Sequence, residues 1–252
     1  MAARISLLCA MIFMVACLPR AAIAGPFDAW AAMVVAGDWH AHSGDPSEVF
    51  DNARRDIAKD LQQMGFAADH IQQYSARPER DPETKPFKSE LATIAANFKR
   101  LSQQAAAGCF VYITSHGAPL AIMLGDGAAP IRVIGDLIDE ACPARPTIVI
   151  VSACFSGMFI PVLHADNRMI LTAARGDRTS FGCGETNTYT FFDQCILESL
   201  PRANGFPMLA DQARECATAR EMAEGVSPPS EPQLYVGSAI ATQLPQLTFS
   251  VH

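Results

Sequence analysis

Hydrophobic residues along this chain gather into short continuous runs separated by segments of helical spacing. A run of four to seven apolar residues is typical of a strand that is buried on both faces of a sheet. The strongest run, residues 147–151, is nearly all β-branched, which favours a strand further. The predicted strands cover residues 30–36, 71–74, 109–114, 120–124, 147–151, 169–172 and 233–236.

Between these runs, apolar residues recur three and four positions apart, as they do on one face of a helix. Asp45-Pro46 is typical of a helix start and Gly65 of a helix end, whereas the charged, proline-containing segment 77–88 is expected to be an exposed loop. Predicted helices cover residues 45–65, 91–101, 134–142, 189–200 and 209–224. Strands that alternate with helices predict one α/β domain over residues 25–252, a three-layer α/β/α sandwich with a mainly parallel sheet.

The first 24 residues have the pattern of a cleavable signal peptide. Arg4 precedes a largely apolar segment, residues 5–18, and a small-x-small sequence ends at Ala24. The apolar segment is shorter than the ~20 residues that a membrane-spanning helix needs. We therefore expect export to the periplasm or beyond, with cleavage after Ala24. A permanent anchor and lipid attachment at Cys17 are disfavoured alternatives.

Composition and charge exclude several classes of partner. Half of the chain is apolar and 18% is charged, so a folded core is expected. The net charge of −7 argues against nucleic acid and anionic membranes as general partners. No glycine-rich nucleotide loop follows any predicted strand, and we expect no cofactor.

Six cysteines remain after the signal peptide, and export would allow them to form disulfides. Six cysteines permit 15 pairings. Cys109 and Cys142 each lie at the start of a predicted strand, and Cys195 and Cys216 fall on consecutive helical segments. We hypothesise that these two pairs are bridged and that Cys154 remains a thiol.

Two residues with catalytic chemistry follow the central predicted strands. Ser115-His116-Gly117 comes after one strand and Ser152-Ala153-Cys154-Phe155-Ser156-Gly157 after another. Ligands of such sheets bind at the carboxyl ends of the strands. If the two strands are neighbours, His116 and Cys154 emerge at the same edge.

A cysteine beside a histidine is suited to nucleophilic catalysis, because the imidazole can accept the thiol proton and later return it. Gly117 offers a backbone N–H that, together with the N–H of Cys154, could hold an oxyanion. The alternative is that Cys154 is a small buried hydrophobic residue and His116 a hydrogen-bonded turn residue.

These motifs resemble the legumain family of cysteine peptidases, in the caspase-like clan. The resemblance rests on the His116 and Cys154 segments and on Thr172-Ala173-Ala174 leading to Thr179-Ser180-Phe181-Gly182-Cys183, and is strongest from residue 109 to residue 185. It implies a caspase-like fold, peptide substrates, His116 and Cys154 as catalytic dyad, and Gly117 in the oxyanion hole.

The pocket residues depart from the family pattern. Ser152 stands where legumains have an acidic residue, and Val49 or Phe50 falls where they have a pocket arginine. Asp38 or Trp39 lies near the place of the asparagine that supports the histidine. Thr179 and Ser180 fit the pocket wall, and Asp193 is the candidate acidic base. We therefore expect peptidase chemistry without asparagine preference; Asp177, Glu185 and Asp193 would instead suit a basic substrate residue.

Two other functions fit parts of the sequence. His40-Ala41-His42 after the first strand could hold zinc in a hydrolase, although no third ligand is evident and no H-E-x-x-H motif occurs. Alternatively, the altered pocket indicates an exported binding or scaffold protein with an inert Cys154. Transfer of the acyl group to an amine instead of water would use the same dyad.

Overall fold

The computed structural model describes residues 25–125 and 127–249. The predicted signal peptide and the Cys17 alternative lie outside these residues. Within them, no helix combines the length and apolar character needed to cross a bilayer. The first and last described segments lie close together, since the rings of Phe27 and Phe249 are 6.2 Å apart.

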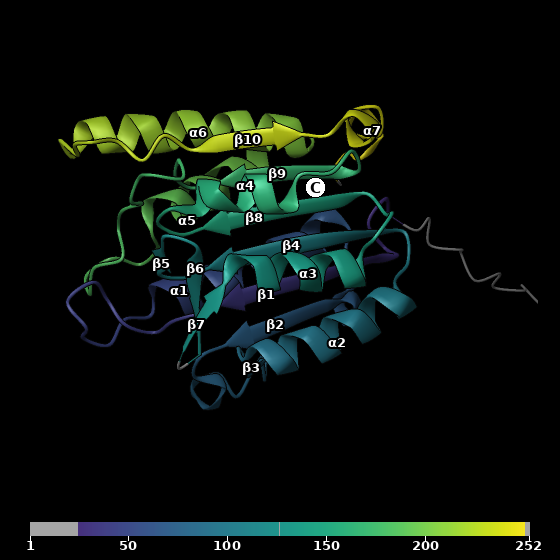
Figure 1. Cartoon of the computed structure of the whole chain (residues 1–252), viewed down its shortest axis with the longest axis horizontal. Helices are drawn as coiled ribbons and strands as arrows, with labels where there is room; N and C mark the ends of the chain where they lie inside the picture. The colour runs from purple at the N-terminus through teal and green to yellow at the C-terminus, as the bar shows by residue number, and fades with distance from the viewer. Residues whose placement is uncertain (1–24, 126, 250–252) are drawn as a thin grey trace, which may run out of the picture.

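A seven-stranded sheet forms the centre of the molecule (Figure 1). Its strand order is β10-β9-β8-β4-β1-β2-β3, and every neighbouring pair is parallel except β10 with β9. The strands are β1 (Trp30–Ala36), β2 (Ile71–Ser75), β3 (Phe87–Lys88), β4 (Gly108–Thr114), β8 (Thr147–Ser152), β9 (Arg168–Thr172) and β10 (Gln233–Val236). The predicted, mainly parallel sheet is confirmed.

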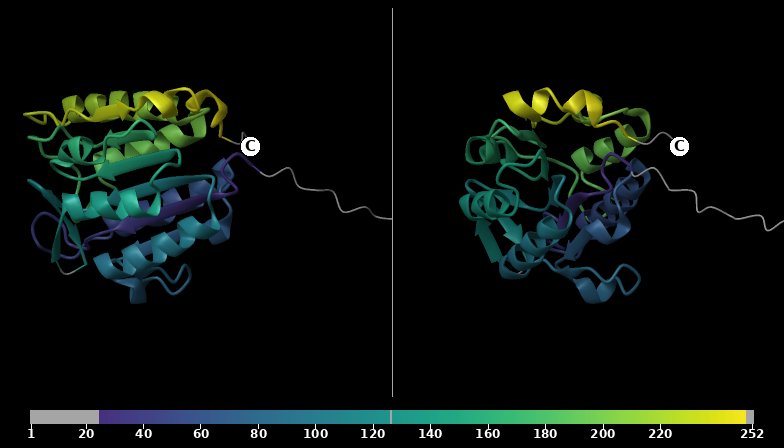
Figure 2. Two further views of the ribbon diagram at one scale, coloured as in Figure 1. Left: turned by 45° about the vertical axis from the view of Figure 1, so that its right-hand side comes forward. Right: turned by 90° about the vertical axis from the view of Figure 1, so that its right-hand side faces the viewer.

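Helices cover both faces of this sheet (Figure 2). They are α1 (Val49–Met64), α2 (Leu91–Gln104), α3 (Ile131–Ala141), α4 (Ile160–Leu163), α5 (Phe191–Ser199), α6 (Phe206–Ala223) and α7 (Ser238–Ala241). Alternate residues of the central strands enter two separate cores. In β4, Phe110 and Tyr112 pack against α1, α5 and α6, whereas Val111 and Ile113 face α2 and α3. The predicted three-layer sandwich is therefore confirmed.

A small antiparallel sheet stands beside the carboxyl end of β4. It consists of β5 (Gly117–Ala118), β6 (Ala121–Leu124) and β7 (Gly127–Pro130). Only β6 corresponds to a predicted strand. β5, the first strand of this small sheet, begins directly after His116, so the sheet holds one side of the candidate site.

Both hypothesised disulfides are present. Cys109 pairs with Cys142, and Cys195 pairs with Cys216. The sequence placed Cys142 at the start of a strand, and this was wrong. Cys142 directly follows the last residue of α3. Of the described cysteines, Cys154 and Cys183 remain thiols.

Candidate active site

The register of two neighbouring strands brings the candidate residues together. β4 and β8 pair in parallel, and their last residues, Thr114 and Ser152, are direct partners. The N–H of Ser115 donates to the carbonyl of Ser152 at 3.1 Å, which extends the pairing by one step. His116 and Cys154 each lie two residues beyond the paired strand ends. Both side chains line the same depression at this edge of the sheet.

The backbone at Gly117 approaches Cys154 too closely for any other residue. A Cβ atom at Gly117 would lie 2.1 Å from the carbonyl oxygen of Cys154 and 3.2 Å from the Cβ of Ala153. A larger residue would therefore separate the His116 and Cys154 segments. This steric clash explains why a glycine follows His116 in the motif.

A tight turn presents Cys154 at the end of β8. Phe155 adopts left-handed backbone angles, φ 58° and ψ 15°, which non-glycine residues rarely occupy. The chain then enters a short 3₁₀ helix, Ser156–Phe159. A Cβ at Gly157 would lie 2.5 Å from the nitrogen of Gly176, so the loop after β9 packs directly on this turn.

The thiol of Cys154 is half-buried and contacts the backbone of Ser180. The Ser180 N–H donates to Sγ at 3.2 Å, and Sγ lies 3.5 Å from the Ser180 carbonyl oxygen, to which the thiol donates. Burial raises the pKa of the Cys154 thiol, although the Ser180 N–H acts in the opposite direction. Burial therefore favours the neutral thiol over the thiolate at Cys154.

The ring of His116 is held by a backbone carbonyl and an aromatic edge. Its Nε2 lies 3.0 Å from the carbonyl oxygen of His40. A carbonyl only accepts, so Nε2 carries the hydrogen in this contact and Nδ1 is the basic nitrogen of the neutral ring. Phe50 packs against the ring edge-to-face, with centroids 5.1 Å apart.

Asp38 fixes the backbone that supplies this carbonyl. Its buried Oδ1 accepts from the N–H groups of Trp39, at 2.6 Å, and of His40, at 3.1 Å, and lies 2.7 Å from Nδ1 of the His40 ring. The segment after β1 therefore orients His116 through a main-chain atom, which side-chain patterns do not reveal.

The predicted pocket residues fall into two groups. Ser152 and Ser180 lie beside Cys154 in a small niche, and Thr179 and Ser180 line a larger adjoining cavity of about 620 Å³. Asp193 lies beneath the site and lines neither space. It is fully buried, and the hydroxyls of Tyr112 and Thr114 each donate to its carboxylate at 2.6 Å.

The acidic residues that would suit a basic substrate side chain do not gather at Cys154. Asp177 pairs with Arg175 on the surface, and Glu185 accepts from the hydroxyl of Ser43. Burial raises the pKa of Asp193, although the Thr114 and Tyr112 hydroxyls act in the opposite direction. None of these carboxylates lines the niche or the larger cavity.

His40 and His42 do not form the basis of a metal centre. The His40 ring contacts Asp38, while His42 lines the larger cavity near Cys154. Within residues 25–125 and 127–249, no three histidine, cysteine or acidic side chains cluster as a metal site requires. The donor set for a zinc hydrolase is thus missing from the described part of the chain.

Sequence reasoning missed two contributors to the site. Cys183, a second thiol, lines both spaces beside Cys154. The carbonyl of His40 supports His116. The motif containing Cys183 was visible in the sequence, but its orientation toward Cys154 depends on how the loop before α5 folds back.

Two comparisons with known proteins bear on the sequence segment and on the fold. The Peptidase C13 family model matches residues 87–201. The crystal structure of caspase-1 from Spodoptera frugiperda superposes with a TM-score of 0.60 at 14% identity, covering 87% of this chain and 92% of that one. The search of curated proteins gave no match. The caspase likeness shows the fold, and the match of the Peptidase C13 family model to residues 87–201 agrees with the resemblance to legumain-type peptidases.

Proposed function

We propose that this protein hydrolyses peptide bonds through a thioester on Cys154, with His116 as general acid and base. The observation that carries the proposal is the pairing of Thr114 with Ser152, which brings the two following segments to one niche. Two further contacts support the proposal. Gly117 approaches Cys154 closely, and the His40 carbonyl accepts the Nε2 hydrogen of His116, which leaves Nδ1 as the basic nitrogen.

Attack and proton transfer are coupled in this mechanism. Because burial keeps the thiol protonated, Nδ1 of His116 accepts the Sγ proton as Sγ bonds to the substrate carbonyl carbon. The N–H groups of Gly117 and Cys154 stabilise the oxyanion; loss of one such donor typically costs ~3–4 kcal/mol. His116 then protonates the leaving amine, and the C–N bond breaks.

Deacylation repeats the same proton transfers with water. His116 accepts a proton from water as its oxygen attacks the thioester carbonyl, and then returns the proton to Sγ as the carboxylic acid product leaves. An amine in place of water would give transpeptidation from the same intermediate. A binding protein with an inert Cys154 would form no intermediate.

A peptide-library assay on the purified protein tests the proposal. Wild type should cleave, whereas Cys154→Ala and His116→Ala should each lose about a thousandfold or more in kcat/KM. His164→Ala is the matched control, because His164 is exposed and hydrogen-bonds only within its own turn, to Pro161. Cleavage that survives Cys154→Ala but not Cys183→Ala would assign the nucleophile to the other thiol and overturn the proposal.

A further inference from the structure

The niche beside Cys154 is far smaller than the adjoining cavity. Its free volume is about 10 Å³, the room of roughly one water molecule. Cys154 and His116 line it together with Phe50, Phe181, Ser152 and Thr190. The larger cavity extends from Cys154 along the loop at residues 179–187 toward α6.

The substrate residue that supplies the attacked carbonyl must place its side chain close to Sγ. That side chain is attached to the carbon next to the carbonyl, so it has little choice of position once Sγ has bonded. Both spaces are bounded by His116 and Cys154, but the niche also lies against the ends of β4 and β8, at Ser115 and Ser152. For that reason the niche is assigned to this side chain, and the larger cavity to neighbouring substrate residues.

The niche walls carry hydroxyl and aromatic groups, and the Asp193 carboxylate is buried behind the Ser152 and Thr190 hydroxyls, which hydrogen-bond to it. Ser152 and Thr190 hydroxyls lie 3.3 Å apart, and the Ser115 hydroxyl donates to the carbonyl of Met123 at 2.8 Å. Among the described residues that line the niche, His116 is the only ionisable side chain besides the two thiols. A long cationic or amide-bearing side chain would find neither room nor a charged partner.

Phe50 forms the wall that limits the size of the niche. Its side chain is 2% exposed and packs with Ala36, Val49 and Cys183, in addition to its contact with His116. Phe50 belongs to the first turn of α1, so its position depends on how firmly that helix start is held.

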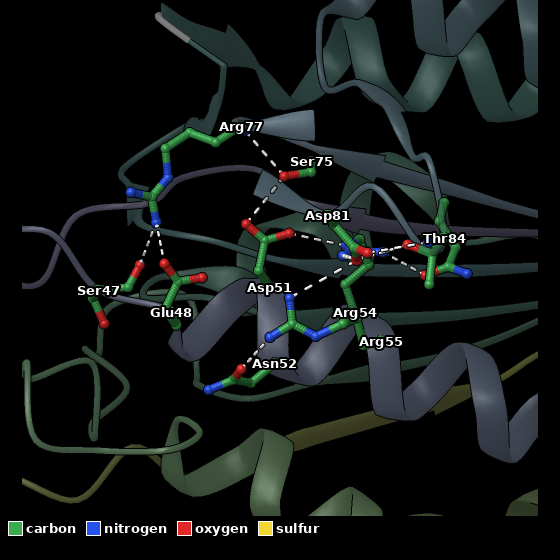
Figure 3. Close-up of polar contacts among 11 residues, drawn as sticks. Ser47, Glu48, Asp51, Asn52, Arg54, Arg55, Ser75, Arg77, Asp81 and Thr84 are labelled. Atoms are coloured by element: carbon green, nitrogen blue, oxygen red, sulfur yellow. Dashed lines mark hydrogen bonds and ion pairs between the residues drawn. The ribbon is translucent and has the colours of Figure 1, made fainter. Parts of the chain in front are cut away.

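Buried ion pairs fix this helix start (Figure 3). Arg54, fully buried in α1, contacts Asp51 at 2.9 Å and Asp81 at 2.5 Å. Arg77 donates to the carbonyl of Ser47 at 3.1 Å and to Glu48 at 2.8 Å, just before the helix. The start of α1 is therefore held on both sides of Phe50, and moving it away from His116 would require breaking these contacts.

We infer that this protein cleaves after a residue with a very small side chain, namely glycine, alanine or serine, and that Phe50 sets this limit. The inference rests on the proposed peptidase function and names its substrate class. On this inference asparagine is excluded from the niche by its size. An asparagine side chain has four heavy atoms, whereas the niche has room for about one or two.

Fluorogenic peptides that differ only in the residue before the scissile bond test this inference. For wild type, kcat/KM with alanine or serine should exceed that with asparagine or arginine by about tenfold or more, since single methylene differences already give 10- to 200-fold. Phe50→Ala and the milder Phe50→Leu should raise the asparagine-to-alanine ratio by about tenfold. The ratio within one variant is used because Phe50 also contacts His116.

Phe98→Leu is the matched control, because Phe98 is a fully buried phenylalanine of α2 in the core between α2 and the sheet. Its ratio should equal that of wild type. A wild-type preference for asparagine or arginine would overturn the inference and leave the peptidase function standing. An unchanged ratio in a folded Phe50 variant would overturn the role of Phe50. Absence of cleavage of every peptide by wild type would overturn both proposals.

Discussion

At Cys154, burial and hydrogen bonding act on the thiol in opposite directions. The Ser180 N–H favours the thiolate, but burial outweighs it and raises the pKa above the ordinary value of 9.0. Catalysis by this thiol therefore depends on a base placed to accept its proton at the moment of attack. We propose His116 as that base, because it lines the same niche and the contact of its Nε2 with the His40 carbonyl leaves Nδ1 without the ring hydrogen.

The raised pKa gives a prediction for thiol alkylation. In a Cys183→Ser background, which leaves Cys154 as the one thiol among residues 25–125 and 127–249, iodoacetamide should react at pH 7 more slowly than with an unstructured cysteine peptide. The rate should still rise above pH 9, because only the thiolate reacts. Peptide mapping by mass spectrometry measures the rate at Cys154. A plateau below pH 7 would contradict the resting neutral thiol.

The juxtaposition of His116 and Cys154 was predictable because each follows a run of buried strand residues. Buried strands are readable from sequence, and parallel strands end at a common edge. The His40 carbonyl was not predictable, since any residue can supply a main-chain oxygen. The role of Phe50 depends on the close packing of α1 against His116, which no local pattern encodes.

Among the elements, α1 has the most constrained surroundings. Arg54 is buried without access to water, so its charge must be balanced by Asp51 and Asp81. Burial raises the pKa of Asp81, but hydrogen bonds from Thr84 and Arg54 outweigh this and lower it to about 2. The segment that contains Asp81, expected to be an exposed loop, is thus partly an internal support for α1.

Replacing Asp81 by asparagine should lower the free energy of unfolding by roughly 3 kcal/mol at pH 7, because it leaves the Arg54 charge undercompensated. The folded pKa lies below the ordinary 3.8, so the Asp81 contribution is fully present above pH 4. It is lost as the pH falls toward 2. Urea unfolding at several pH values measures this effect. The difference in free energy of unfolding between wild type and Asp81→Asn should become smaller as the pH falls.

Asp177→Asn is the control for this experiment. Asp177 pairs with Arg175 on the surface, where screening by solvent leaves such a pair little net stabilisation. Equal losses for the two variants, or a difference at Asp81 that widens as the pH falls, would contradict the buried ion-pair account.

Strands with long apolar runs were predicted well, and the short ones were not. β3, β5 and β7 have two to four residues and little apolar pattern, so they form only because partners are adjacent. α1 begins at Val49, not at the predicted Asp45, because the chain near Pro46 instead bridges back to His40. Pairing across the chain overrides local helix signals at this point.

For the whole molecule, the mainly parallel sheet separates the candidate site from the Cys109–Cys142 disulfide. Cys154 and His116 follow the carboxyl ends of β8 and β4, whereas Cys109 lies at the start of β4 and is bridged to the end of α3. The sequence predicted the layers and both disulfides. The strand order, in which β4 lies between β1 and β8, could not be predicted. The packing of the crossover helices decides which strands are neighbours, and no local sequence pattern encodes that packing.

The central claim is a covalent acyl-enzyme at Cys154. An activated ester of a small residue such as alanine, mixed rapidly with the protein and quenched in acid, should leave an acyl group on the peptide that contains Cys154. The rate of adduct formation in His116→Ala should be lower than in wild type by about a hundredfold or more. Mass spectrometry that finds product formation without this adduct, or the acyl group on another residue, would contradict the account.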